Sequence, residues 1–192
     1  MDLIMGVCLG IGLSTACGLR VFVPLLVMSI ASLSGHLSLS PEFDWIGTYP
    51  ALVAFAIAAV IEILLYLVPF FDNLLDTIAT PAAIIAGIIA TASCVSEVSP
   101  FLQWSLAIIA GGGSAGTLQG ITALTRGAST ATTGGLGNPV VSTAEMGGAI
   151  LLSILAIVFP VLVCLVVIVF LFFVGKKVFK KFRKTGHATA IS

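Results

Sequence analysis

The chain has 192 residues, of which 59% are hydrophobic and 8% are charged, and its formal net charge is zero. A soluble domain carries about 25% charged residues, so this composition excludes a water-covered globule, and it also excludes a disordered chain. The mean hydropathy of +1.22 and the long charge-free runs predict an all-α integral membrane protein that has the lipid bilayer as its partner.

The basic residues gather near the C-terminus. Six of the eight Lys and Arg residues lie between positions 176 and 184, after an apolar run over 146–175. One short basic segment does not make a nucleic-acid-binding face. Next to a membrane helix it marks the cytoplasmic side, so residues 176–192 are predicted to be a cytoplasmic tail of a multi-pass protein in the bacterial inner membrane. The rest of the chain has two arginines against eight acidic residues, a formal charge of −6 that favours cations or protons as the transported species.

The apolar stretches predict about five transmembrane helices in a single domain, residues 1–175, because a crossing needs about 20 helical residues. They cover residues 3–33, 49–71, 81–96, 101–125 and 148–174. Glycines are expected to break the first and fourth spans, and Pro81 suits the first turn of the third. Five glycines and six hydroxyl residues in 127–147 argue against a regular helix throughout that stretch.

The topology follows by counting back from the tail. The 127–147 loop, the FDNLLDT connection after the second span and the N-terminus are expected outside, and the 34–48 loop is expected in the cytoplasm. In the alternative, the first stretch is a re-entrant hairpin, which moves the N-terminus inside.

The first and fourth spans resemble each other in sequence. GIGLSTACGLR and GGGSAGTLQGITALTR both place a Ser after glycines and an Arg further on. Three spans separate the starts of the two units, so a true duplication would be an inverted repeat, a design common in transporters. The alternative is that glycine-rich helices merely look alike. GxxxG spacing at Gly6 and Gly10, and in the 112–120 segment, predicts either close internal packing or a homodimer.

Arg20 and Glu62 are the two charges well inside the predicted spans. Charges are costly in hydrocarbon, so we expect the two to pair or to share a polar cavity. A buried carboxylate can carry a proton, as a proton-coupled carrier requires. The alternative is an ion pair that only fixes the packing of two helices.

A second group of polar residues is expected at the outer ends of the spans. Asp72 and Asp76 lie four residues apart and would share a helical face. With these two, the predicted group comprises Arg126, Asn138 and Glu145. Together they would form an acidic vestibule that attracts a cation or an amine; ordinary solvated loop residues are the alternative.

The sequence argues against an enzyme. It has no metal-ligand cluster, no recognisable cofactor motif, and no nucleophile with a base, since both histidines lie outside the spans. The GxGxxG string that starts at Gly111 follows no strand and has apolar surroundings, so dinucleotide binding is excluded. We therefore expect no catalytic residue, metal or cofactor.

Three motifs resemble a family of small bacterial integral membrane proteins that is catalogued only as a domain of unknown function. The motifs are GLRVFVPLL, EILLYLVPFFDNLLDTIATPAA and TRGASTATTGGLGNP. The resemblance covers most of the chain and implies a helical fold in a membrane, without implying a reaction.

These observations favour a small transporter or channel-like protein for a cation or a proton-coupled solute whose identity stays open. Two alternatives belong to other classes. In a lipid-handling protein of the flippase or scramblase kind, the broken spans open a groove and Arg126 meets a headgroup phosphate. In a membrane assembly or scaffold protein, the buried charges serve packing alone.

Overall fold

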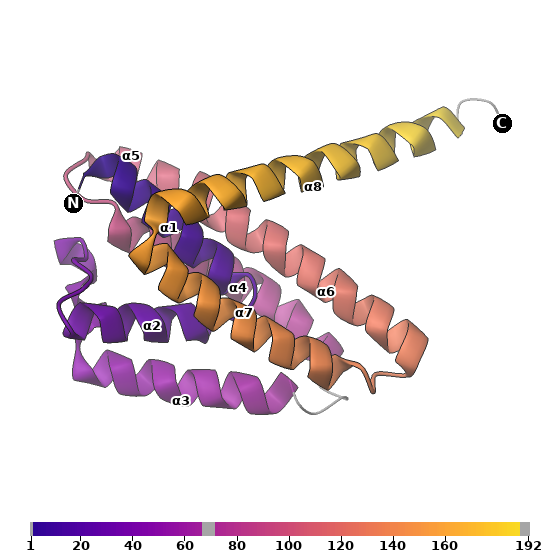
Figure 1. The fold of residues 1–192 in the computed structure, drawn as a ribbon, viewed down its shortest axis with the longest axis horizontal. Helices are drawn as coiled ribbons and strands as arrows, with labels where there is room; N and C mark the ends of the chain where they lie inside the picture. Colours follow the sequence, from indigo (N-terminus) through magenta and orange to yellow (C-terminus); the bar gives the residue numbers. More distant parts are fainter. Residues whose placement is uncertain (1, 67–71, 189–192) are drawn as a thin grey trace.

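The computed structural model describes residues 2–66 and 72–188; the side chains of 72–76 and 178–188 fall outside the described part. The described residues form helices joined by short connections, with no strand among them, as expected for an all-α protein (Figure 1). The elements are α1 (Leu3–Cys17), α2 (Phe22–Leu33), η1 (Pro41–Gly47), α3 (Tyr49–Tyr66), α4 (Asp72–Cys94), α5 (Pro100–Leu106), η2 (Ala107–Gly112), α6 (Gly113–Thr133), α7 (Asn138–Val158) and α8 (Pro160–Ala188).

The first apolar stretch is broken, as expected, and it folds back on itself. Residues 18–21 separate α1 from α2, which have 15 and 12 residues. At 1.5 Å per residue these helices are about 22 and 18 Å long, too short for a hydrocarbon core of about 30 Å. The start of α1 and the end of α2 lie at the same end of the molecule (Figure 1). The stretch therefore has the shape of the re-entrant hairpin rather than that of a single crossing.

Helix α1 lies in the centre of the bundle and packs against α4, α6, α7 and α8. Its GxxxG glycines, and those of η2 and α6, face α4 of the same chain. Gly10 lies against Thr91, and Gly116 lies against Ile84, whereas Gly120 has open space around it. These glycine faces therefore serve internal packing, and they lend no support to the predicted homodimer.

The third predicted span begins earlier than expected, because α4 starts at Asp72. The segment FDNLLDT was expected to be a connection, and residues 72–77 of it belong to the helix instead. An acidic residue is favourable in the first turn of a helix, where the backbone dipole is positive. Pro81 then falls inside α4, a position that membrane helices tolerate when neighbouring groups satisfy the freed carbonyl.

The fourth predicted span is one helical run formed by α5, η2 and α6, in which η2 is a π-helical segment that ends on the first two residues of the glycine run 111–113. The run continues to Thr133, so most of 127–147 is helical and the connection shrinks to residues 134–137. Gly134 ends α6 in the left-handed conformation at φ +64°, which glycine adopts without strain. Its N–H bonds to the Thr130 carbonyl oxygen at 2.9 Å.

The fifth predicted span, 148–174, is divided between two helices, α7 and α8. Pro160 lacks an N–H group and disfavours the helical conformation in the residue before it, and Phe159 indeed leaves the helix at φ −131° and ψ 61°. The turn sends α8 back toward the end of the molecule at which 134–137 lies (Figure 1). The C-terminal part of α8, residues 176–188, and this turn thus lie toward the same end, whereas the sequence count placed them on opposite sides.

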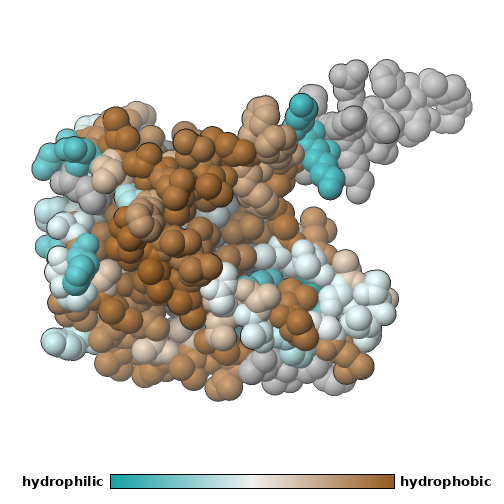
Figure 2. Space-filling model, viewed as in Figure 1, coloured by the Kyte–Doolittle hydropathy of each residue, from teal (hydrophilic) through white to brown (hydrophobic). Residues whose placement is uncertain are grey.

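Four helical segments of the described chain are long and apolar enough to cross a membrane. They are Tyr49–Tyr66, Thr77–Cys94, Asn138–Val158 and Pro160–Lys177. Figure 2 shows a largely apolar surface between two more hydrophilic ends. The apolar helices indicate a multi-pass membrane protein, and the count of five spans stays a prediction.

We expect Gly87→Ala to lower the melting temperature. The added methyl group meets the Ala115 side chain and the Gly111 carbonyl oxygen, and overpacking of this kind costs about 1–3 kcal/mol. The matched control is Gly147→Ala in α7, where nothing lies within 4 Å of the added carbon and alanine favours the helix. Thermal unfolding of both variants in one detergent checks the difference; equal melting temperatures would contradict the close helix crossing.

Candidate functional site

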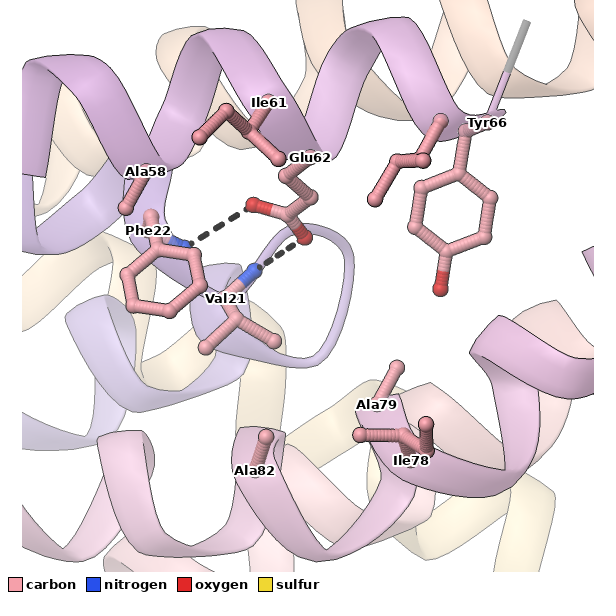
Figure 3. A pocket seen from close by; sticks show the side chains of 10 residues that line it. Val21, Phe22, Ala58, Ile61, Glu62, Tyr66, Ile78, Ala79 and Ala82 are labelled. Carbon is pink, nitrogen blue, oxygen red and sulfur yellow. Dashed lines mark hydrogen bonds between the residues drawn. The ribbon is translucent and has the colours of Figure 1, made fainter. Parts of the chain in front are cut away.

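The side-chain carboxylate of Glu62 on α3 accepts hydrogen bonds from backbone N–H groups in the turn of the hairpin. The Val21 N–H donates to Oε1 at 2.8 Å, and the Phe22 N–H donates to Oε2 at 3.1 Å (Figure 3). These donors belong to the N-terminal end of α2, where N–H groups lack helical partners and the helix dipole favours a negative charge. Glu62 therefore supplies that charge from another helix, and it is buried in doing so.

Arg20 lies in the same break and binds α7. Its Nη2 donates to the Ser142 carbonyl oxygen at 2.9 Å and to the Ser142 hydroxyl, and it lies 3.7 Å from Glu145 Oε2. The side chain is 1% exposed, and its Nε and Nη1 atoms have no hydrogen-bond partner among the described residues. The buried guanidinium group of Arg20 thus has N–H donors that make no hydrogen bond to the described residues.

Arg126 of α6 forms an ion pair with the same Glu145. Both guanidinium groups also lie over the Tyr66 ring, with the Cζ atoms of Arg20 and Arg126 at 4.2 and 3.9 Å from its centroid. An aromatic face attracts a cation most strongly where water is excluded. We call these five residues, Arg20, Glu62, Tyr66, Arg126 and Glu145, the charge cluster.

The predicted pairing of Arg20 with Glu62 is not what the structure contains. Among the described residues Arg20 forms its ion pair with Glu145, while Glu62 accepts from backbone N–H groups. The two residues remain neighbours in one polar region, because Arg20 lies over Tyr66, one helical turn after Glu62 on α3. The sequence left two arrangements open, an ion pair or a shared polar region, and the contacts of Arg20 and Glu62 correspond to the second.

The predicted outer vestibule also differs from the structure. Arg126, Asn138 and Glu145 are all buried, with exposed fractions of 2%, 1% and 7%. They lie inside helices rather than in a loop, and the Asn138 amide donates to the Thr130 hydroxyl at 2.8 Å, across the turn between α6 and α7. The side chains of Asp72 and Asp76 lie outside the described residues, so their predicted role stays a prediction.

Tyr66 and Ser142 contact the buried arginines but were not among the site residues predicted from the sequence. A signal for Tyr66 was present, because a spacing of four residues places it on the same helical face as Glu62. Ser142 offered no such signal, since its contact with Arg20 joins residues 122 positions apart in the chain.

A pocket of about 260 Å³ lies beside Glu62 (Figure 3). Residues of α3 and α4 and the start of α2 line it, and all except Glu62 and Tyr66 are apolar. Ile61 and Ile78 of this lining are more than half exposed on the apolar surface of the molecule. The pocket therefore lies between that surface and the charge cluster.

Taken together, the apolar helices and the buried charges indicate a multi-pass helical membrane protein with a polar centre. The sequence model of DUF4126, a domain of unknown function, matches residues 7–179, so the chain belongs to that family. This confirms the resemblance carried by the three sequence motifs. No curated protein and no solved structure matches the chain.

Removal of the Glu145 carboxylate should destabilise the fold. Glu145→Ala leaves the guanidinium groups of Arg20 and Arg126 without this shared anion, and removal of one partner from a buried ion pair costs about 3–5 kcal/mol. We expect a loss of that size in the free energy of unfolding, measured by titration with sodium dodecyl sulfate. Glu42→Ala, at an exposed acid of η1, is the control and should change it by less than about 0.5 kcal/mol. Equal stability of the two variants would refute the structural role of Glu145.

Proposed function

We propose that this protein is a small transporter of the bacterial inner membrane that couples proton movement to the movement of a small solute. One observation carries the proposal. The half-length helix α2 begins inside the bundle, where its first N–H groups donate to the Glu62 carboxylate beside Arg20. Half-length helices that meet at the middle of a bundle form the substrate and ion sites of many transporters. Charges retained in such a place are usually functional.

Glu62 is the proton carrier in this proposal. As a carboxylate it accepts hydrogen bonds from the N–H groups of Val21 and Phe22 and neutralises the positive end of the α2 dipole. A proton on Glu62 removes that charge and weakens both hydrogen bonds. Proton binding thereby changes the balance between two positions of the α1–α2 hairpin, which is the bistable element that a coupled carrier requires.

The solute site lies on the other side of the break, around Arg20. Its Nε and Nη1 atoms offer N–H donors that are unused among the described residues, and Glu145 and Tyr66 hold the guanidinium in place. A solute with hydrogen-bond acceptors fits these donors. The four charged groups of the charge cluster balance to zero, so the site does not require the solute to carry a net charge.

The orientation follows from the charges at the two ends of the molecule. Lys176 and Lys177 are exposed on α8 just after its apolar part, and the remaining basic residues of the tail follow them in the sequence. Exposed acids of the described chain lie instead at the end formed by the N-terminus, η1 and the α4–α5 connection; these are Asp2, Glu42, Asp44 and Glu97. We place the lysine end in the cytoplasm. The 134–137 turn then faces the cytoplasm and the 34–48 segment faces outward.

The lipid-handling alternative has less support, because it requires a groove open to lipid at Arg126. Arg126 is 2% exposed, so its side chain is buried in the bundle rather than open to lipid. The scaffold alternative predicts that Arg20→Ala and Glu62→Ala both leave function intact, an outcome that would favour it over transport.

Glu62→Gln should abolish coupled transport while the protein stays folded. The amide keeps the shape of the side chain and an acceptor oxygen, and it cannot exchange a proton. Proteoliposomes loaded with a pH-sensitive dye, under an imposed proton gradient, are tested with Na⁺, K⁺, primary amines and small neutral solutes. We expect at least one of these to drive proton movement through the wild-type protein, and a drop of at least about tenfold in Glu62→Gln.

The matched control is Glu42→Gln, which makes the same change at an exposed acid and should transport at the wild-type rate. Gel filtration and melting temperature establish that each variant is folded. Unchanged proton movement in Glu62→Gln, or no response of the wild-type protein to any solute of the panel, would refute the proposal.

A further inference from the structure

Four aromatic rings form a row across one end of the molecule. Trp45 of η1 contacts Phe55 of α3, with ring centroids 6.0 Å apart, and Phe43 of η1 contacts Trp104 of α5 at 6.2 Å. Both tryptophans of the chain belong to this row. It lies at the end of the bundle at which Figure 1 shows α5 and the N-terminus. We call these four residues the aromatic row.

The inner sides of η1 and α5 hold the aromatic row in place. Phe43 and Ile46 of η1 are buried in the core. Gln103 of α5 is also buried, and its Nε2 donates to the Ala92 carbonyl oxygen at 2.9 Å and to the Val95 carbonyl oxygen at 3.0 Å. Both carbonyls belong to the C-terminal end of α4, so η1 and α5 are fixed against that helix.

The two indole rings of the row face outward. Trp45 is 50% exposed and Trp104 is 43% exposed, and neither indole N–H donates a hydrogen bond to the described residues. An indole ring has a large apolar body and one polar N–H group. Such side chains gather at the membrane–water interface, where the ring lies in an apolar layer and the N–H reaches headgroups or water.

The exposed surface changes character next to the row, at Tyr49. Before this residue η1 exposes the acidic side chains of Glu42 and Asp44. After it, α3 continues for 18 residues, about 27 Å, which is close to the hydrocarbon thickness of about 30 Å. The large hydrophobic side chains that α3 exposes after Tyr49 are Val53, Ile57, Val60, Ile61 and Leu64. The aromatic row therefore lies at one boundary of the apolar surface.

We propose that the aromatic row lies at the headgroup level of the bilayer, where the indole N–H groups of Trp45 and Trp104 donate to phospholipid oxygens. The row then fixes the depth of the bundle in the membrane, with Glu42 on the water side and the hydrocarbon beginning at Tyr49. Lipid is the partner because the row continues into the exposed apolar side of α3, which has the length of a whole crossing. This placement is independent of the solute that the protein transports.

The first experiment measures the depth of each tryptophan. Trp104→Phe leaves Trp45 as the single reporter, and Trp45→Phe leaves Trp104. The variants are placed in phosphatidylcholine vesicles whose lipids have bromine atoms either close to the ester groups or close to the bilayer centre. We expect the shallow bromines to quench the fluorescence of both tryptophans at least about twofold more strongly than the deep bromines.

The matched control puts one tryptophan in the middle of α3. Ile57→Trp in a Trp45→Phe/Trp104→Phe background occupies a position that is 56% exposed, about 12 Å along the helix from Tyr49. Its quenching should show the opposite order. Stronger quenching of Trp45 and Trp104 by deep bromines would overturn the proposal. Quenching only by acrylamide in the water would also overturn it, as would protection from every quencher, which would indicate a protein partner or a second copy.

The second experiment locates the boundary with the native tryptophans in place. Glu42→Cys and Val53→Cys are treated in vesicles with a membrane-impermeant maleimide on both sides, and the wild-type protein gives the background of the four native cysteines. Thiols react as thiolates, which hydrocarbon disfavours, so we expect Glu42→Cys to be labelled at least about tenfold faster than Val53→Cys. Unfolding in sodium dodecyl sulfate should make the two rates equal. Equal rates in the vesicles would place the boundary elsewhere and overturn the proposal.

Discussion

The buried guanidinium groups of Arg20 and Arg126 impose the strictest requirement on this fold. A charge in hydrocarbon needs a partner, and these two share the Glu145 carboxylate and the Tyr66 ring. The four groups come from the break after α1 and from α6, α7 and α3. Those segments must therefore meet at one point. Apolar burial gives little driving force between helices in a bilayer, so charge pairing is a principal determinant of their arrangement.

The break of the hairpin, which contains Arg20, reaches the charge cluster because α1 lies at the centre of the bundle. Ser14 and Ser114 form a hydrogen bond of 2.8 Å where α1 and α6 cross, and each hydroxyl also contacts a carbonyl of its own helix. Small side chains let helix backbones come this close in a membrane. This packing accounts for the sequence likeness of the two glycine-rich regions. The inverted repeat stays a prediction, because the two matches disagree. Matching Ser14 with Ser114 offsets the two regions by 100 residues, whereas matching Arg20 with Arg126 offsets them by 106.

The sequence predicted the broken first stretch and the importance of Arg20 and Glu62, because charges within apolar runs are rare enough to identify singly. It failed over 127–147, where hydroxyl residues suggested a loop. Thr132, Thr133 and Thr143 donate to carbonyl oxygens four residues earlier at 2.7–2.9 Å, so their polarity is satisfied inside helices. The shared anion of the two arginines was beyond prediction, since hydropathy and spacing carry no information on which distant helix faces another.

The charge cluster lies nearer to one end of the molecule than to the other. Arg126 and Glu145 are each about 10 Å along their helices from the 134–137 turn, whereas Glu62 is about 20 Å along α3 from Tyr49. The longer side also contains the hairpin α1–α2. In the transport cycle proposed above, the site is close to the end of the lysines, and the barrier that must open is the one toward the opposite end. Glu62 accepts two hydrogen bonds from the turn of that hairpin, so in the proposed cycle a proton on Glu62 would act directly on the element that must move.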